Sequence, residues 1–158
     1  MVIIRPYCPE DLEKVIQLWW RTWHETFTEL THPQSYGVWM VRFRDELAVR
    51  GLIWVAELEN QIVGFVVVMP EERYLDQIFV DTRYHNRGIG SMLLKKAKEA
   101  CPQGLTLQTL QRNTQVSAFY ERHGFQPGKL GVNKINGQLN IEYCWLPLLD
   151  ESRGNITY

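Results

Sequence analysis

Apolar residues recur along the chain with two different periods, and their order predicts the elements of the fold. VIIRPY reads as a short first strand. Apolar residues then recur at helical spacing from Leu12 to Trp23, so we expect a helix that runs to about Phe27. The stretch THPQSYG breaks this pattern. A second helix is expected from Val38 to Val49, with Gly51 as its stop.

The rest of the chain alternates between β-rich runs and two further helical segments. LIWVAEL and IVGFVVVM are joined by ENQ and predict a hairpin, and YLDQIFV predicts a third strand after the loop PEER. YHNRGIGSMLLKKAKEA begins with a glycine turn and continues as an amphipathic helix. LTLQTLQ predicts a strand, and NTQVSAFYERHGF a short helix closed by Gly124. KLGVNKI and QLNIEYCWL flank Asn136-Gly137, a strong hairpin signal.

The predicted order of elements is β-α-α-β-β-β-α-β-α-β-β, which is typical of an α+β (mixed α/β) fold. The hairpins require antiparallel pairing, whereas the strand-helix-strand unit from Leu75 to Leu110 indicates a parallel pair. We therefore expect a mixed, mostly antiparallel sheet of about seven strands, flanked by about four helices, in one domain over residues 1–150. The polar tail at 151–158 is expected to be frayed.

Composition, charge and cysteine spacing argue against several classes of function. The chain has 158 residues and a formal net charge of −1, so no global field favours nucleic acid or an anionic membrane. No apolar run approaches the roughly 20 residues of a membrane helix, and no signal peptide is visible. The cysteines Cys8, Cys101 and Cys144 and the four histidines show no metal-ligand spacing. We expect reduced thiols, no metal and a cytoplasmic location.

The glycine turn after YLDQIFV indicates an anion site. The free N–H groups at a helix N-terminus carry about half a positive charge. Gly88 and Gly90 would let the backbone approach a ligand closely, and Arg87 adds a full charge. Neither a Walker A loop nor a three-glycine dinucleotide fingerprint is present. The pattern favours a phosphate or pyrophosphate at this turn, and the alternative is a tight turn with glycines for steric reasons alone.

Two segments resemble the signatures of a known family. LDQIFVDTRYHNRGIGSMLLKKA is similar to the central motif of the GNAT superfamily of acyl-CoA N-acyltransferases, a strand ending in V-x-x-x-[YFH]-[RQ]-x-x-G-x-[GA] before a helix. NTQVSAFYERHGF resembles the second signature, N-x-x-[AS]-x-x-F-Y-x-x-x-G-F. The order of elements matches as well, so the resemblance covers nearly the whole chain. One position departs from it: His85 stands where the family usually has Arg or Gln, which implies weaker cofactor binding.

The resemblance implies acetyl-CoA as the cofactor. Its pyrophosphate would lie on the backbone of the glycine turn, which comprises His85, Asn86, Arg87, Gly88, Ile89, Gly90 and Ser91. Its pantetheine would pair like a strand with Ile78, Phe79 and Val80, where the sheet splays open in a V. Asn113 would contact the pantetheine arm, and Tyr120 would lie near the thioester sulfur.

Acyl transfer to an amine needs an acid for the leaving thiol and a base for the amine. Tyr120 is the candidate acid, because a phenol with a pKa near 10 stays protonated at pH 7. Asp76 is the first choice for the base, as the one acid within YLDQIFV. It could equally pair with a neighbouring arginine. The alternatives are a chain of waters or one of four side chains: Glu71, Glu72, His24 and Glu25.

Aromatic residues of the first two helices are expected to wall the acceptor side in such a fold. The candidates are Trp23, His24, Phe27 and Trp39, although Trp23 also lies at core spacing. An aromatic wall suits a small amine with an apolar body. We therefore expect a small-molecule N-acetyltransferase, monomeric or homodimeric. The alternatives are a non-catalytic acyl-CoA-binding module and a peptide or protein acetyltransferase.

Overall fold

The computed structural model describes residues 1–147. Within these residues the chain forms two compact units, residues 1–100 and residues 101–147. Two predictions lie outside the described residues: the frayed tail at 151–158 and the last three residues of the predicted domain. The single domain over 1–150 stays a prediction.

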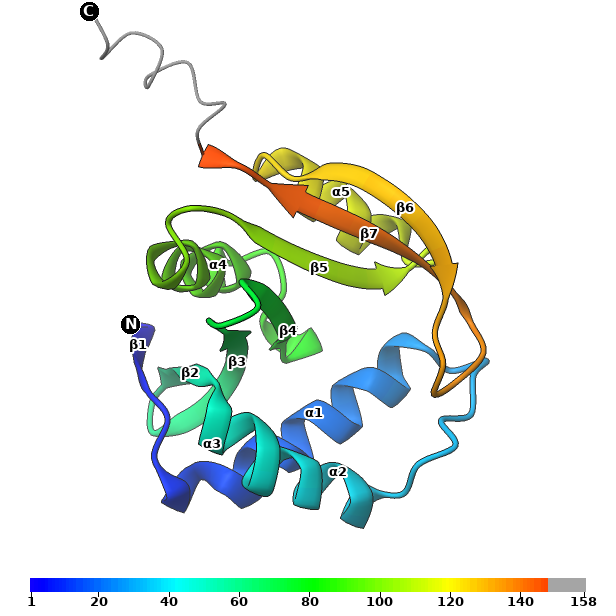
Figure 1. Ribbon diagram of the computed structural model, residues 1–158. Coiled ribbons are helices and arrows are strands. Elements are labelled where there is room, and N and C mark those ends of the chain that lie inside the picture. The colour runs from blue at the N-terminus through cyan, green and yellow to red at the C-terminus, as the bar shows by residue number, and fades with distance from the viewer. Residues whose placement is uncertain (148–158) are drawn as a thin grey trace, which may run out of the picture. The chain divides into compact units, whose positions relative to one another are not determined.

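The first unit holds four strands and most of the helical residues (Figure 1). Its elements in chain order are β1 (Ile3–Pro6), η1 (Pro9–Asp11), α1 (Leu12–Thr26), α2 (Tyr36–Arg42), η2 (Phe43–Leu47), α3 (Ala48–Arg50), β2 (Leu52–Leu58), β3 (Gln61–Met69), β4 (Tyr74–Val80), η3 (Thr82–Tyr84) and α4 (Ile89–Ala100). The strands pair antiparallel in the order β1-β2-β3-β4. The expected hairpin between β2 and β3 turns at Glu59 and Asn60, which both have positive φ.

Strand β3 lies between two layers of helices, and for this reason its sequence is continuously apolar. Residues 63–69 are all buried. Phe65 and Val67 belong to the core cluster that includes side chains of α1 and α2. A Cβ at Gly64 would meet Leu93 and Ile89 of α4 at 3.1 and 3.5 Å, so the opposite face packs on α4. Figure 1 shows α1, α2 and α3 on one side of these strands and α4 on the other.

Strand β4 carries one extra residue relative to β3. Val67 pairs with Gln77 and Val68 pairs with Leu75, so Asp76 is the bulged residue. A bulge bends its strand and redirects a side chain. Asp76 therefore departs from the simple inside–outside alternation that its neighbours in sequence would predict.

The second helical segment is longer than the sequence indicates. It begins at Tyr36 rather than Val38, because the Ser35 hydroxyl accepts a hydrogen bond from the Val38 N–H and caps the helix. It continues through the π-helical segment η2 into α3 and ends before Gly51, as expected. Gly51 has an ordinary negative φ. A glycine is required there because a Cβ would lie 2.6 Å from the Leu47 carbonyl oxygen.

The second unit contains β5 (Leu105–Leu110), α5 (Thr114–Arg122), β6 (Gln126–Val132) and β7 (Leu139–Trp145). β7 pairs antiparallel with both β5 and β6. The predicted two-residue turn at Asn136-Gly137 is wrong, because six residues connect β6 to β7. The Asn133 carboxamide accepts hydrogen bonds from the N–H groups of Ile135 and Asn136 and organises this longer turn. Gly137 keeps the expected positive φ. The predicted fold class, with seven strands in the described residues, is confirmed.

Replacing Gly51 with alanine is expected to destabilise the protein by roughly 1–3 kcal/mol, because the new methyl group must displace backbone atoms. Besides the Leu47 oxygen, it would approach the Val68 carbonyl oxygen at 3.1 Å. Gly37→Ala is the matched control: in helix α2 its Cβ meets only Ser35 Oγ, at 3.9 Å, so it should stabilise by up to about 1 kcal/mol. Urea unfolding measures both. Equal free energies of unfolding for wild type and Gly51→Ala would contradict this assignment.

Candidate functional site

The loop that connects β4 to α4 comprises residues 81–88 and contains η3. Residues 85–88 are exposed, and Asn86 and Gly88 have φ values of 64° and 80°. A Cβ placed on Gly88 would meet no atom within 4 Å, so the space above this residue is open. Glycine is thus required at position 88 by its backbone torsion rather than by crowding.

Helix α4 begins directly at this loop. Its first residue, Ile89, is 1% exposed and anchors the helix on the sheet. The Met92 N–H donates to the Gly88 carbonyl at 3.1 Å, so Gly88 is the last residue before the helix. The N–H groups of a first helical turn have no intrahelical acceptor and attract anions. Arg87 lies over the ring of Tyr84, 5.2 Å from its centroid, next to these groups.

The side chain of His85 turns back toward strand β4. Its Nε2 lies 2.8 Å from the Val80 carbonyl oxygen and therefore carries the hydrogen that it donates. This ring nitrogen is thus used within the protein and does not donate to a ligand. The backbone of His85 remains part of the exposed loop.

A buried carboxylate holds the start of this loop. Asp81 is 2% exposed, directly after β4, and it accepts hydrogen bonds from Arg83 at 2.8 Å and from Arg21 of α1 at 2.6 Å. It also accepts from the backbone N–H of Arg83 at 3.0 Å. Burial raises the pKa of Asp81, but the hydrogen bonds and the charges of both arginines outweigh it and leave the pKa below its ordinary value.

A second contact joins the same loop to α1. The Thr82 hydroxyl donates to the Glu25 carboxylate at 3.0 Å. Arg21 and Glu25 are one helical turn apart, so they face the same side of α1. The last turns of α1 therefore position the loop from Asp81 onward. Sequence analysis missed Arg21 and Asp81, although an aspartate directly after an apolar strand and before a basic residue is a visible signal.

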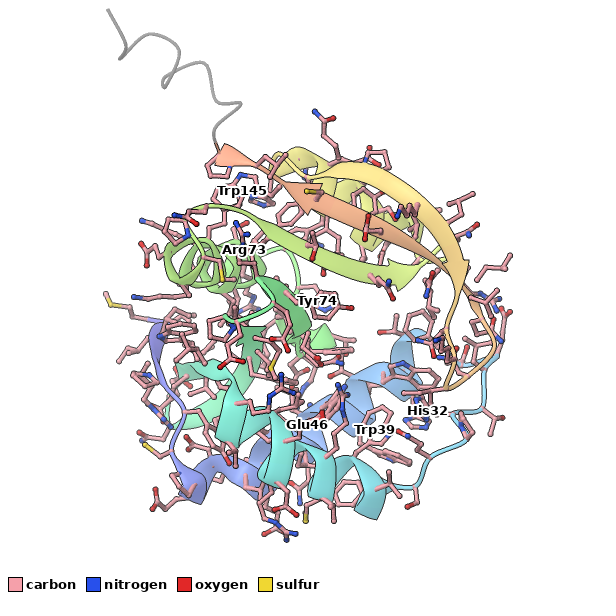
Figure 2. All side chains as sticks on the ribbon, in the orientation of Figure 1. His32, Trp39, Glu46, Arg73, Tyr74 and Trp145 are labelled. Atoms are coloured by element: carbon pink, nitrogen blue, oxygen red, sulfur yellow. The ribbon has the colours of Figure 1, made fainter. Side chains whose placement is uncertain are left out.

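Aromatic side chains gather where the end of α1 meets α2. Trp39 contacts Trp23, with ring centroids 6.1 Å apart, and His32, at 4.8 Å; Figure 2 shows His32 and Trp39 next to each other. Trp23 and Trp39 are 8% and 3% exposed and so belong to the core. Of the four predicted acceptor residues, only His24 and Phe27 are half-buried.

Trp20 is a member of this group that sequence analysis missed. It is half-buried, and its ring lies 4.3 Å from that of His24 and 5.0 Å from that of Trp39. The spacing of four residues between Trp20 and His24 on one helix could have revealed the pair. We call Trp20, Trp23, His24, Phe27 and Trp39 the aromatic cluster.

The predicted base Asp76 is held by an ion pair. Arg42 of α2 donates to both of its carboxylate oxygens, at 3.0 and 3.1 Å, and the Gln77 amide donates at 3.1 Å. The arginine pairing that the sequence left open is therefore present. The catalytic role of Asp76 stays a prediction.

Comparison with known proteins decides the family. The model of the acetyltransferase (GNAT) domain matches residues 49–127, which include β4, the glycine loop and α5. The chain belongs to the GNAT acetyltransferase family. It is similar to the uncharacterized N-acetyltransferase YafP of Escherichia coli strain K12, with 32% identity over 130 residues, 80% of this chain and 82% of the relative.

Two further GNAT proteins are similar to this chain. Peptidyl-lysine N-acetyltransferase YjaB of Salmonella typhimurium is 31% identical over 127 residues, 80% of this chain and 84% of the relative. The crystal structure of PaiA N-acetyltransferase from Thermoplasma acidophilum in complex with coenzyme A matches with a TM-score of 0.71 and 19% identity, over 90% of this chain and 98% of that one. This last likeness shows the fold.

This GNAT chain is therefore an acetyltransferase, and acetyl-CoA is its acetyl donor. The loop of the first unit fits the diphosphate of that donor. Its backbone is exposed, the space above Gly88 is open, and Arg87 adds positive charge beside the α4 N-terminus. The assignment of residues 85–91 and of Ile78, Phe79 and Val80 to the cofactor stays a prediction. These three β4 residues are half-buried.

The other two predicted site residues lie in the second unit. Asn113 caps α5, because its side-chain oxygen accepts from the Val116 N–H at 3.3 Å. Tyr120 is 4% exposed, and its ring packs near Phe125 and Tyr143, with centroids 5.5 and 5.9 Å away. This aromatic packing holds the ring in one place. The proposed contacts of both residues with the cofactor stay predictions.

Neither a metal cluster nor a membrane helix is found in the part of the chain that the structure describes. Within residues 1–147, no three histidine, cysteine or acidic side chains gather so that they could hold a metal ion. None of the helices described there is long and apolar enough to cross a membrane.

Asp81→Asn is expected to lower the free energy of unfolding by roughly 1–3 kcal/mol at pH 7, because two arginines lose their charged partner. The folded-state pKa of Asp81 is lowered. The stabilisation is therefore complete above the unfolded pKa of about 3.9 and disappears as the pH falls through the lower folded value. Urea unfolding at a series of pH values measures the difference between wild type and variant.

Asp45→Asn is the control for this comparison. Asp45 also pairs with an arginine, Arg44, but both side chains are more than half exposed. Its replacement should leave the unfolding free energy unchanged at every pH, because solvent screens an exposed pair. The difference in unfolding free energy between wild type and Asp81→Asn should shrink at low pH. If it stays the same there, the charge of Asp81 does not cause the stabilisation.

Proposed function

We propose that this GNAT acetyltransferase transfers an acetyl group to the primary amine of a small molecule by direct attack on the thioester. The observation that carries the proposal is the aromatic cluster: three of its members, Trp20, Trp23 and His24, lie on α1, the helix that also contacts the loop after β4. Half-buried rings at Trp20, His24 and Phe27 offer an apolar surface at the end of the helix whose Arg21 and Glu25 contact Asp81 and Thr82.

Aromatic rings suit an amine with an apolar body. Such rings bury apolar surface and attract an ammonium group through their π faces. Two acids on neighbouring elements are paired: Asp76 with Arg42, and Glu72 with Arg50. A polycationic acceptor would favour unpaired carboxylates, and so these pairs support a small amine.

The reaction requires two proton transfers. Acetyl-CoA supplies an acetyl group activated as a thioester. An alkylamine with a pKa of about 10.4 needs about 4.6 kcal/mol to reach its neutral form at pH 7. Protonation of the leaving thiol, with a pKa of about 8.5, gains only about 2 kcal/mol. Removal of the ammonium proton is therefore the larger demand.

Tyr120 is the proposed acid for the leaving thiol. Its phenol keeps its proton at neutral pH and can donate it. The ring is fixed by the aromatic contacts of α5, β7 and Phe125, so the direction of its hydroxyl is set before the reaction. The assignment comes from the family resemblance of the segment NTQVSAFYERHGF.

A peptide acceptor is the second candidate. The relative from Salmonella typhimurium is named a peptidyl-lysine N-acetyltransferase, and a lysine side chain is also a primary alkylamine. The two candidates differ in what surrounds the amine rather than in the reaction. The third reading, a non-catalytic binding module, is set aside because the chain belongs to an enzyme family.

Thiol release tests the proposal. The protein is mixed with acetyl-CoA and either small aryl-alkylamines such as phenethylamine, or lysine peptides with blocked N-termini. We expect faster thiol release with the small amines. A higher kcat/KM for the peptides would replace the small-molecule acceptor with a peptide one, and release without any amine-dependent product would refute amine acetylation.

Gly88→Val is expected to abolish acetyl-CoA binding. The side chain would occupy the open space above the loop, and φ of 80° strains a β-branched residue. Gly137→Val is the matched control, because φ is 72° and the space is equally open there. Both variants should lose similar stability, whereas only Gly88→Val should lose affinity in calorimetry. Retained affinity would remove the loop from the cofactor site.

Tyr120→Phe is expected to lower kcat by about 10²-fold with little change in acetyl-CoA affinity, because only the proton donor is lost. Tyr143→Phe removes a neighbouring buried hydroxyl, which donates to Glu121 at 2.7 Å, and should lower stability without this loss of kcat. Steady-state kinetics and calorimetry measure both variants. An unchanged kcat in Tyr120→Phe would make the residue a core aromatic only.

A further inference from the structure

The base that receives the ammonium proton can be chosen from the structure, given the amine acetylation proposed above. Of the candidates from the sequence, the carboxylates of Asp76, Glu72 and Glu25 each lie within ion-pair distance of an arginine. Each of these carboxylates thus already faces an arginine of the protein instead of a ligand. Glu71 is exposed in the turn between β3 and β4, where no described side chain orients it. His24 remains.

The tautomer of His24 is set by its own helix. Nδ1 lies 2.7 Å from the Trp20 carbonyl oxygen. A carbonyl can only accept, so Nδ1 carries the hydrogen and Nε2 carries the lone pair of the neutral ring. No residue within 1–147 makes a hydrogen bond to Nε2. The ring is held by Trp20 at 4.3 Å and by Trp23 at 5.0 Å, so the direction of Nε2 is fixed.

The helix that carries His24 is also bound to the end of β4. Arg21 and Glu25, on either side of His24 in sequence, hold Asp81 and Thr82. Phe79 of β4 packs against the core cluster that contains Trp23, the neighbour of His24. These contacts place His24 on the face of α1 next to the one that holds the strand end and its loop.

We propose that Nε2 of His24 is the general base that takes the proton from the acceptor ammonium, bound on the aromatic cluster. The freed lone pair of the amine forms the new N–C bond, the C–S bond breaks, and the departing sulfur takes a proton. The proton on Nε2 passes to solvent. The nitrogen loses a second proton when the amide forms. This proton returns to the acid that protonated the sulfur, so the protons balance.

The second histidine of this region, His32, is a weaker candidate for the general base. Its Nδ1 accepts a hydrogen bond from the Gln34 N–H at 3.1 Å. Burial, and then the charge of His24, lower the pKa of His32. The other titratable groups around His24 are Arg21 and Glu25 on its own helix and Tyr36 of α2, across Trp20. Arg21 and Glu25 are engaged with the loop, and Tyr36 has a pKa raised by burial.

The test compares His24→Gln with wild type in kcat/KM across pH, using acetyl-CoA with phenethylamine or a lysine peptide, whichever releases thiol faster. We expect a loss of about 10²-fold at pH 7 that shrinks toward about pH 10, where the amine loses its proton unaided. The acid limb that a protein group sets in the wild-type profile should be replaced in the variant by a rise of kcat/KM that follows only the ionisation of the amine. Added imidazole should restore part of the rate, and aniline, which is neutral at pH 7, should show little loss.

His123→Gln, a histidine outside the aromatic cluster, should keep the wild-type profile. Acetyl-CoA affinity should be equal in all three proteins. A His24→Gln profile with the same acid limb as wild type, or a loss that is equal at all pH values and for aniline, would overturn the base. Absence of amine-dependent thiol release in wild type would instead refute the proposed function, and the base with it.

Discussion

The buried carboxylate of Asp81 is the contact on which the first unit's site depends. It stands at the end of β4, accepts hydrogen bonds from Arg83 of the loop and from Arg21 of α1, and is almost fully shielded from solvent. A buried charge is tolerated only when it is paired and hydrogen-bonded. That requirement couples three elements: the strand, the exposed loop and the last turns of α1.

Three sets of side chains on helix α1 therefore make different contacts. Trp19 and Trp23 fill the core beneath the sheet. Arg21 and Glu25 hold the residues after β4, and Trp20 and His24 form the half-buried edge of the aromatic cluster. Because 3.6 residues make one turn, side chains adjacent in sequence point to different partners. A single helix therefore links core packing, the proposed cofactor loop and the proposed acceptor surface.

Much of the fold and of the glycine loop could be predicted from local patterns. The strand YLDQIFV was predicted with its observed ends, since alternation and β-branched residues are local signals. Gly88 was predicted because a positive φ before a helix selects for glycine in any context. The turn after Val132 was mispredicted, because the Asn133 side chain outweighed the local preference of Asn136-Gly137.

By itself, the sequence determined the element order, the glycine loop and the family, because each of these depends on residues that are close together along the chain. Only the tertiary structure decided how the titratable side chains are used. Asp76 lies 34 positions from Arg42, and Arg21 lies 60 from Asp81, yet each pair is in contact. Whether a carboxylate or a histidine nitrogen can accept a proton depends on such partners, and partners distant in sequence are fixed only when the chain has folded.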